Sequence, residues 1–201
     1  LTVGLQARSL SYEHIEVEME LLRDTSIRVV ETQHVKMDGK WNGLFRDFDP
    51  RGADGIVSDA LYENGRPYQK GSIYRKGGYA LEDQEGGVIR VKWRSVEQGK
   101  SVNNLRTEFS IQYRIIGAIG QFKNRDMFYW KPIFQDREHR IHKATVRLKL
   151  PEPVDRADVT FYSEVRDAQW RFNDRRDELI FTATDVPTSD EFEIKVELPK
   201  G

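Results

Sequence analysis

The sequence predicts an all-β fold, an antiparallel β-sandwich of the immunoglobulin-like type, and three observations support this. Four stretches, residues 15–21, 109–115, 146–150 and 192–198, alternate apolar with polar residues at a period of two. Successive side chains of a strand point to opposite faces, so this pattern buries one face of a sheet and exposes the other. Turn-forming residues recur between such stretches. Charged residues make up 32% of the chain, as expected where half of each strand faces solvent.

Turn residues divide the first half of the chain into strands. An Asp and a Ser occur in the tight connection 23–26, and Asp-Gly at 38–39 and Asn-Gly at 64–65 mark two further turns. An aromatic-rich segment at 41–50 stops at a proline. Strands are therefore expected over residues 12–22, 27–37, 56–62, 67–75, 79–82 and 88–93.

The second half resumes the same pattern after a polar stretch. Gly117 and Gly120 follow the strand expected over residues 107–116 and interrupt the alternation. Pro151 ends the strand expected over residues 141–150. Helix signals are confined to a single turn near Asp126 or Asp136. Roughly a dozen strands are expected in all. Those of the second half lie over residues 107–116, 127–134, 141–150, 158–165, 168–172, 178–184 and 191–198.

The length of 201 residues suits one large domain or two sandwich modules of about 100 residues each. Residues 1–201 are therefore treated as one β-sandwich domain, with a candidate internal boundary at the polar stretch 95–106. The pattern leaves open whether the strands form one continuous sandwich or two packed sandwich halves.

Composition excludes several classes of partner and chemistry. The net charge is −1 and basic residues are spread among acidic ones, so no basic stripe forms and we expect no nucleic-acid partner. The lack of cysteine removes disulfides, thiolate catalysis and cysteine-ligated zinc. No run approaches the ~18–20 apolar residues that span a bilayer. The chain starts without Met and ends just after a strand, so we expect membrane and targeting segments to lie outside it.

Motifs of known catalysts are missing from the sequence. Neither the Gly-x-Ser-x-Gly elbow of serine hydrolases nor a phosphate-binding loop occurs. We expect no catalytic residue, no cofactor and no enzymatic activity. Asp126, which precedes Met-Phe-Tyr-Trp, is the one acid singled out for an apolar setting that could raise its pKa, and a turn or capping role is favoured for it over acid chemistry.

The four histidines do not predict a metal site. His139 and His142 lie three residues apart at the entry to a strand, which turns them to opposite faces. His14 and His34 lie on neighbouring expected strands and are able to meet across the ladder. Two imidazoles without a third ligand are a weak signal, and we expect no bound metal.

Two aromatic clusters offer a candidate binding surface, one within residues 41–48 and the other at 128–130. Three consecutive aromatic residues cannot all enter the core from one strand, so at least one faces a crevice or the surface. Exposed aromatic rings stack on sugars or anchor protein partners, whereas the alternative is that Trp130 fills the space between sheets. The binding hypothesis rests on Trp41, Phe45, Tyr129 and Trp130, with Arg46 as a polar anchor.

Several segments also occur in the order of a known family. They are residues 12–17, 27–32, 43–48 and 109–119, an Asp-x-x-Tyr-Trp motif at 126–130, Leu-Pro-x-Pro at 150–153, and residues 196–201. This order resembles the predicted membrane protein family described as domain of unknown function 2207, over nearly the whole chain. The resemblance implies an extracytoplasmic β-rich domain, with a signal segment before it and transmembrane helices after it. It supplies no reaction and no catalytic residue.

These points together predict a non-enzymatic, extracytoplasmic domain of a bacterial membrane-anchored protein that serves as a binding or assembly module of the cell envelope. Its partner would be an unknown envelope protein or a glycan, and it would meet the membrane through segments outside this chain. The alternative is a carbohydrate-binding or carbohydrate-active sandwich, in which aromatic stacking would hold the sugar.

Two positions in the family-like segments suggest a buried ion pair. Glu31 follows two valines in an expected strand, and Arg46 lies in the aromatic segment. A Glu–Arg pair would tie the second strand to that segment. A separation of more than ~6 Å between the two side chains would contradict this hypothesis.

Overall fold

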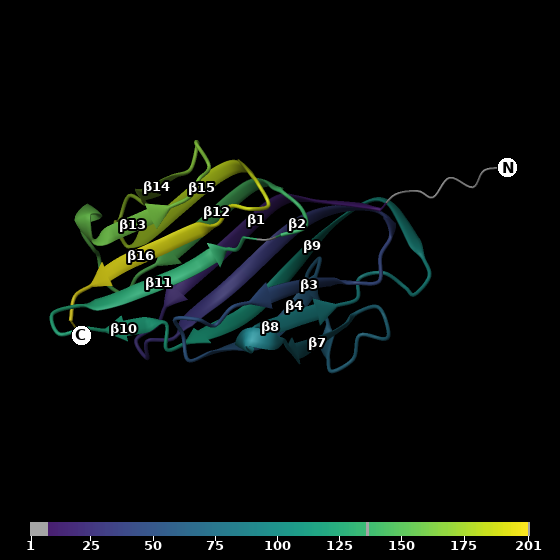
Figure 1. Cartoon of the computed structure of the whole chain (residues 1–201), viewed down its shortest axis with the longest axis horizontal. Coiled ribbons are helices and arrows are strands. Elements are labelled where there is room, and N and C mark those ends of the chain that lie inside the picture. The colour runs from purple at the N-terminus through teal and green to yellow at the C-terminus, as the bar shows by residue number, and fades with distance from the viewer. Residues whose placement is uncertain (1–7, 136, 201) are drawn as a thin grey trace.

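The computed structural model describes residues 8–135 and 137–200, and it is built of β-strands. One eight-stranded sheet forms a floor, and two four-stranded sheets lie side by side over one of its faces (Figure 1). Two short 3-10 turns, Glu85–Gly87 and Arg156–Asp158, are the helical elements of the described residues. The all-β sandwich predicted from the sequence is confirmed.

The floor sheet takes strands from both halves of the chain. Its long central strands alternate buried with more exposed residues, as the period-two pattern predicts. In spatial order it consists of β14 (Gln169–Phe172), β15 (Glu178–Val186), β12 (Ile141–Lys149), β1 (Ser9–Leu21), β2 (Ile27–Lys40), β9 (Ser101–Ile116), β4 (Gly55–Glu63) and β5 (Arg66–Pro67).

The two covering sheets are called the β3 sheet and the β11 sheet below. In spatial order, the β3 sheet consists of β3 (Leu44–Phe48), β8 (Ile89–Trp93), β7 (Gly78–Asp83) and β6 (Gln69–Lys70). The β11 sheet consists of β10 (Ile119–Gln121), β11 (Asp126–Ile133), β16 (Phe192–Leu198) and β13 (Val159–Tyr162).

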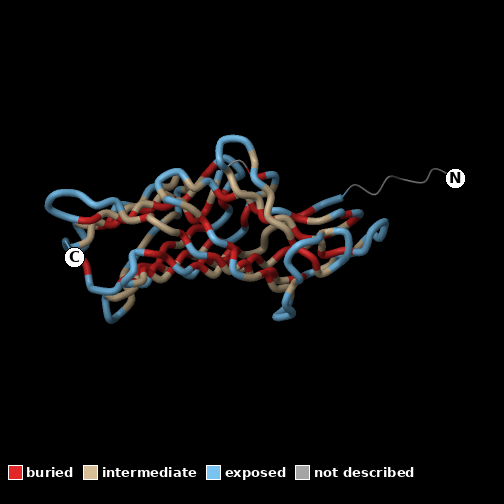
Figure 2. Tube along the Cα trace, turned by 90° about the horizontal axis from the view of Figure 1, so that it is seen from below, coloured by how far each residue is buried: buried red, intermediate tan, exposed pale blue. Residues whose placement is uncertain are grey.

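The core lies between the floor and its two covers. Strand register aligns Phe181, Val146, Val17, Glu31 and Ile111 in one row across five neighbouring strands, and all five residues are buried. Residues directly opposite one another share a face of the sheet. One face of the floor is therefore covered across most of its width, and Figure 2 shows the buried residues gathered between the layers.

Aromatic rings join each cover to the floor. Phe48 of the β3 sheet packs against Tyr113 of β9, with ring centroids 4.5 Å apart. Phe161 of the β11 sheet packs against Phe181 of β15 at 5.0 Å. Such tilted aromatic pairs add to the stabilisation that comes from burial of their area.

The topology differs from a purely antiparallel sandwich at two ladders. β1 pairs with β12 in parallel, with Val17 opposite Val146, and β6 pairs with β7 in parallel. The parallel ladder of β1 and β12 joins strands far apart in the chain, and the whole β3 sheet is formed by residues between them. The immunoglobulin-like part of the prediction is not confirmed, because one broad sheet serves as the floor for both covers.

The structure differs locally from the sequence-based expectations in three places. Of the strand expected over residues 67–75, only the two-residue elements β5 and β6 form beside irregular chain. Residues 101–106, part of the candidate boundary stretch 95–106, begin strand β9; most of their side chains are exposed, so they lack the alternation of a half-buried strand. Asp126 begins β11 and so does not form a helical turn. Asp136 lies outside the described residues.

Candidate functional site

A cavity of about 680 Å³ opens between the two covering sheets, with residues of β1 also in its lining. Two strand edges border it. β3 is the edge strand of its sheet, and β10 pairs with β11 only at residues 126–128. In the described part of the chain, Tyr129, Trp130 and Ile133 of β11 pair with β16 alone, so the opposite edge of β11, which borders β3, has no strand partner there (Figure 1).

All five residues of the sequence-based binding hypothesis line this cavity. Trp41, Phe45 and Arg46 come from the β2–β3 segment, and Tyr129 and Trp130 come from β11. Phe45 is 42% exposed and Tyr129 is half-buried, whereas the other three are buried. The two aromatic clusters, distant in sequence, are thus two walls of one cavity.

Trp41 is held in the first wall through its ring nitrogen. Nε1 donates a hydrogen bond of 2.8 Å to the backbone carbonyl of Asp38. The guanidinium of Arg8 lies 4.9 Å from the ring centroid, and the His139 ring meets Trp41 edge-on at 6.2 Å. Because the N–H is already engaged, Trp41 offers the cavity apolar ring surface.

Arg46 is held in the same wall by the predicted ion pair. Its Nε donates to the two carboxylate oxygens of Glu31 at 3.1 and 3.2 Å, so that hypothesis is confirmed. Its guanidinium carbon lies 4.5 Å from the centroid of Phe48 and 3.6 Å from that of Phe134. Gln33 donates to the same carboxylate at 2.6 Å. Arg46 is therefore a structural link between β2 and β3 as well as a lining residue.

Residues of β11 form the second wall of the cavity, and their burial alternates along the strand. Phe128 and Trp130 are buried, and Tyr129 and Lys131 between and after them are only partly buried. The aromatic run is thus split between the two faces of the strand. Within residues 8–135 and 137–200, Trp130 Nε1 has no hydrogen-bond partner although the side chain is 6% exposed. Buried donors are usually satisfied, so this buried N–H adds no favourable hydrogen bond to the wall.

Several charged groups around the cavity form ion pairs. Lys131 Nζ lies 2.6 Å from Glu191 Oε1, and this hydrogen bond raises the pKa of Lys131. Arg90 donates two bonds of 2.7 Å to the carboxylate of Asp47. Such pairs neutralise each other, so the cavity suits an amphipathic ligand better than a highly charged one.

Sequence reasoning missed lining residues that come from other segments. Tyr12 of β1 and Phe134 and Arg137 beyond β11 also line the cavity. Burial, reinforced by the nearby Glu31, raises the pKa of Tyr12 from 10.0 to about 12, so its hydroxyl stays protonated at neutral pH. Arg137 donates to the carbonyl of Asp190 at 2.9 Å. No local sequence signal marks these residues, because long-range strand pairing brings them to the site.

The acids near the cavity are arranged for structure. Asp126, the acid singled out in the sequence, is not among the lining residues, and Lys200 Nζ donates to it at 2.8 Å. Asp49 accepts a 2.7 Å bond from Arg51, which lowers the pKa of Asp49. A general acid needs a raised pKa in an apolar setting, whereas the pKa of Asp49 is lowered.

The histidines of the second half have separate neighbours. His139 lines the cavity, and burial lowers its pKa. His142 lies on β12 with Nδ1 3.5 Å from Asp185. The two imidazoles thus contact different groups.

The family model of the predicted membrane protein (DUF2207) N-terminal domain matches residues 11–198. The chain belongs to the DUF2207 family. The match takes in β3, β11 and the cavity between them, and it confirms the resemblance drawn from segment order. This DUF2207 chain is thus an N-terminal domain of a predicted membrane protein. None of the curated proteins matches it.

Solved structures show where else this fold occurs. A Parabacteroides distasonis protein described as a candidate protease aligns at a TM-score of 0.57 and 10% identity, over 93% of the DUF2207 chain and 40% of its own. Yeast leukotriene A4 hydrolase in complex with bestatin aligns at 0.58 and 13%, over 92% and 28%. The DUF2207 chain therefore spans less than half the length of either protein.

At these identities the likeness shows the fold alone. The sequence also lacks His-Glu-x-x-His, the spacing that binds zinc in many metallopeptidases. Within the residues that the structure describes, no helix has the length and apolar character needed to cross a membrane.

Proposed function

We propose that this DUF2207 domain is a non-enzymatic binding module of a cell-envelope membrane protein, and that the cavity takes an extended polypeptide segment of an envelope partner. One observation carries the proposal: the two aromatic clusters meet at one cavity of about 680 Å³ between two strand edges. Volumes of ~300–1,000 Å³ are typical of ligand sites.

The strand edges favour a polypeptide ligand. An edge strand presents backbone N–H and C=O groups with which an extended peptide can pair as an added strand. Leu44–Phe48 of β3 and the Tyr129–Trp130 part of β11 offer such edges on the two sides of the cavity, and Pro132 ends the second one because it has no N–H. Main-chain hydrogen bonds would supply affinity, and rings such as Phe45 and Tyr129 would contact alternate side chains of the peptide.

The chemistry of the lining sets the composition of that peptide. The walls carry aromatic rings, and the nearby charges of Lys131 and Asp47 are already paired. Desolvating a further charge there would cost free energy without a partner. A segment with apolar and aromatic side chains at alternate positions fits best.

We further propose that the domain lies on the extracytoplasmic side of the membrane. The basis is the family description, which makes this chain the N-terminal domain of a predicted membrane protein. Protease added to intact cells should cleave within the domain of the full-length protein. Protection of the domain until the cells are lysed would overturn this orientation.

Random peptide display against the folded chain tests the binding proposal. Selected peptides should be rich in apolar and aromatic residues, and they should slow amide exchange in β3 and β11. Phe45→Ala and Tyr129→Ala should each weaken binding at least about 10-fold, because anchor side chains dominate such interfaces. Tyr74→Ala is the matched control, since Tyr74 is 84% exposed and not among the lining residues.

A glycan array run with the same variants separates the carbohydrate alternative. If the parent chain binds specific glycans but no peptides, and Tyr129→Ala loses the glycan binding, the cavity binds sugar and the polypeptide proposal is wrong. Peptide binding that is equal in the parent, Phe45→Ala and Tyr129→Ala would show that the cavity is not the site.

A further inference from the structure

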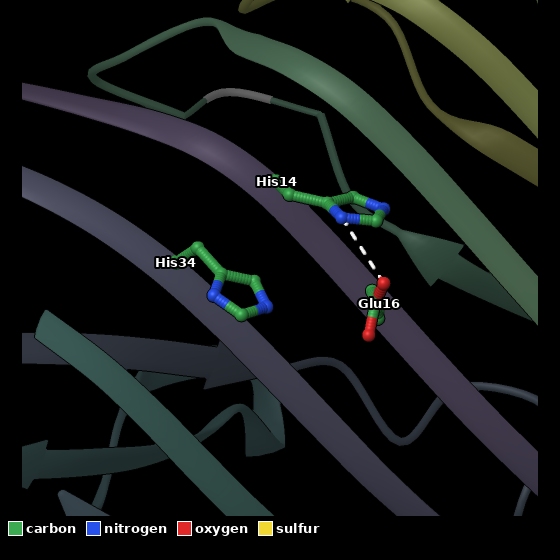
Figure 3. A group of neighbouring side chains, drawn as sticks. All are labelled: His14, Glu16 and His34. Atoms are coloured by element: carbon green, nitrogen blue, oxygen red, sulfur yellow. Dashed lines mark ion pairs between the residues drawn. The ribbon is translucent and has the colours of Figure 1, made fainter. Parts of the chain in front are cut away.

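A second candidate site lies on the face of the floor sheet that the two covers leave open. His14 and Glu16 lie on β1 and His34 lies on β2, with His14 directly opposite His34 in the antiparallel ladder. Residues two apart on a strand share a face, as do residues directly opposite. All three side chains therefore project from the same side of the sheet, as Figure 3 shows.

The three side chains bring their potential ligand atoms close together. The imidazole rings stack with centroids 5.7 Å apart and planes inclined by 22°. Nδ1 of His14 lies 3.1 Å from Oε1 of Glu16. One ligand atom from each residue lies within 4.8 Å of the others. Tetrahedral ligands on zinc lie about 3.3 Å apart, so binding requires the side chains to rotate and close the widest of these gaps by about 1.5 Å.

Each imidazole also has a neighbour at its other nitrogen. His14 Nε2 forms a 3.0 Å hydrogen bond with Thr145 Oγ1 on β12. His34 Nδ1 lies 3.8 Å from Glu108 Oε2 on β9. In Figure 3 a ring nitrogen of His34 points toward Glu16. Metal-binding histidines are oriented by such partners of the non-ligating nitrogen, so four adjacent strands contribute to this arrangement.

We propose that His14, Glu16 and His34 bind a divalent transition-metal ion, with Zn²⁺ as the reference ligand. Imidazole and carboxylate ligands suit Zn²⁺, Cu²⁺ and Ni²⁺, and three protein ligands leave a position open for water or a partner group. The site lies on the opposite side of the floor from the cavity, so it is independent of the proposed peptide binding.

Calorimetric titration of the chelator-treated chain with Zn²⁺ tests the proposal. We expect one Zn²⁺ per chain and a rise in melting temperature, because a ligand that binds only the folded state stabilises it. His34→Ala and Glu16→Gln should each weaken Zn²⁺ binding at least as much as loss of an orienting partner does, about 10–100-fold. Both side chains are partly exposed, so these variants should fold.

Two further variants distinguish this site from adventitious binding. His142→Ala removes an exposed histidine of β12 outside the cluster and should leave the affinity unchanged. Thr145→Val removes the orienting oxygen and should weaken binding about 10-fold while all three ligands remain. Absence of Zn²⁺ binding, or equal affinity in the parent, His34→Ala and Glu16→Gln, would overturn the proposal. So would a loss of binding in His142→Ala alone.

Discussion

At the residue scale, the ion pair of Glu31 and Arg46 both stabilises the domain and positions one edge of the cavity. The two side chains are 1% and 4% exposed. Removing both charges from water is costly, and good geometry is needed to offset that cost. Here one guanidinium nitrogen contacts both carboxylate oxygens, and Gln33 adds a further bond. The pair fixes β3 over β2 and thereby sets one edge of the cavity.

Arg46→Met should destabilise the domain by about 3–5 kcal/mol, because it leaves a buried carboxylate without its counter-charge while nearly keeping the side-chain volume. Urea unfolding followed by circular dichroism measures the change in the free energy of unfolding. Arg106→Met is the control, since Arg106 forms an exposed pair with Glu13 and should change stability little.

The double variant Glu31→Leu with Arg46→Met should recover most of that loss, because no uncompensated charge remains. If Arg46→Met is as stable as the parent, the pair does not hold β3 in place.

At the element scale, the short link from β2 to β3 sets the first wall of the cavity. Gly43 in this link has φ of +152°, and a Cβ at this position would lie 2.4 Å from the backbone oxygen of Trp93 on β8. The close approach lets Leu44 enter the ladder opposite Trp93. Only glycine fits both the backbone conformation and the space.

Gly43→Ala should lower stability by about 1–3 kcal/mol from backbone strain alone, with the clash added. In a domain of this size each kcal/mol shifts the melting temperature by about 2–4 °C, which thermal unfolding resolves. Gly55→Ala is the matched control, because Gly55 has no positive φ and its added Cβ meets no described atom within 4 Å. Equal melting temperatures for the two variants would show that β3 tolerates displacement.

At the scale of the whole molecule, one broad sheet holds two covers whose adjoining edges frame the cavity. Contacts distant in sequence dominate this arrangement, since β1 pairs with β12 and β2 with β9. Buried and partly buried tyrosines make the stability of this interior depend on pH. Burial raises the pKa of Tyr12 from 10.0 to about 12, and it also raises those of Tyr68 and Tyr113.

The free energy of unfolding should therefore fall as the pH rises from about 10 to 12. A raised pKa means that the folded state holds the phenolic proton more tightly, so this contribution is complete below pH 10 and lost as the pH climbs through the folded pKa. Urea unfolding between pH 8 and 12, with phenolate absorbance, measures it. Tyr12→Phe should flatten the decline, and Tyr74→Phe should not. Titration of all tyrosines near pH 10 in the folded chain would contradict the prediction.

Much of the site was visible in the sequence at the level of single residues. The aromatic clusters at 41–48 and 128–130 and the Glu31–Arg46 pair could be named, because side-chain type and strand alternation are local properties. That the two clusters meet at one cavity could not be predicted, because it depends on how the β3 sheet and the β11 sheet pack on the eight-stranded sheet. The metal candidate shows the same limit: His14 and Glu16 share a strand face by spacing, but only the ladder register places His34 opposite His14.

The sequence by itself determined that the chain is all-β, where most strands lie, and which face of each strand is buried. Period-two alternation decides these points within a few residues. Only the tertiary structure decided which strands are neighbours, including the parallel ladder of β1 and β12, and which side chains meet at the cavity and around His14. Alternation determines which face of a strand is buried but not which strand lies beside it. Strand pairing and register depend on the sum of contacts across the whole molecule.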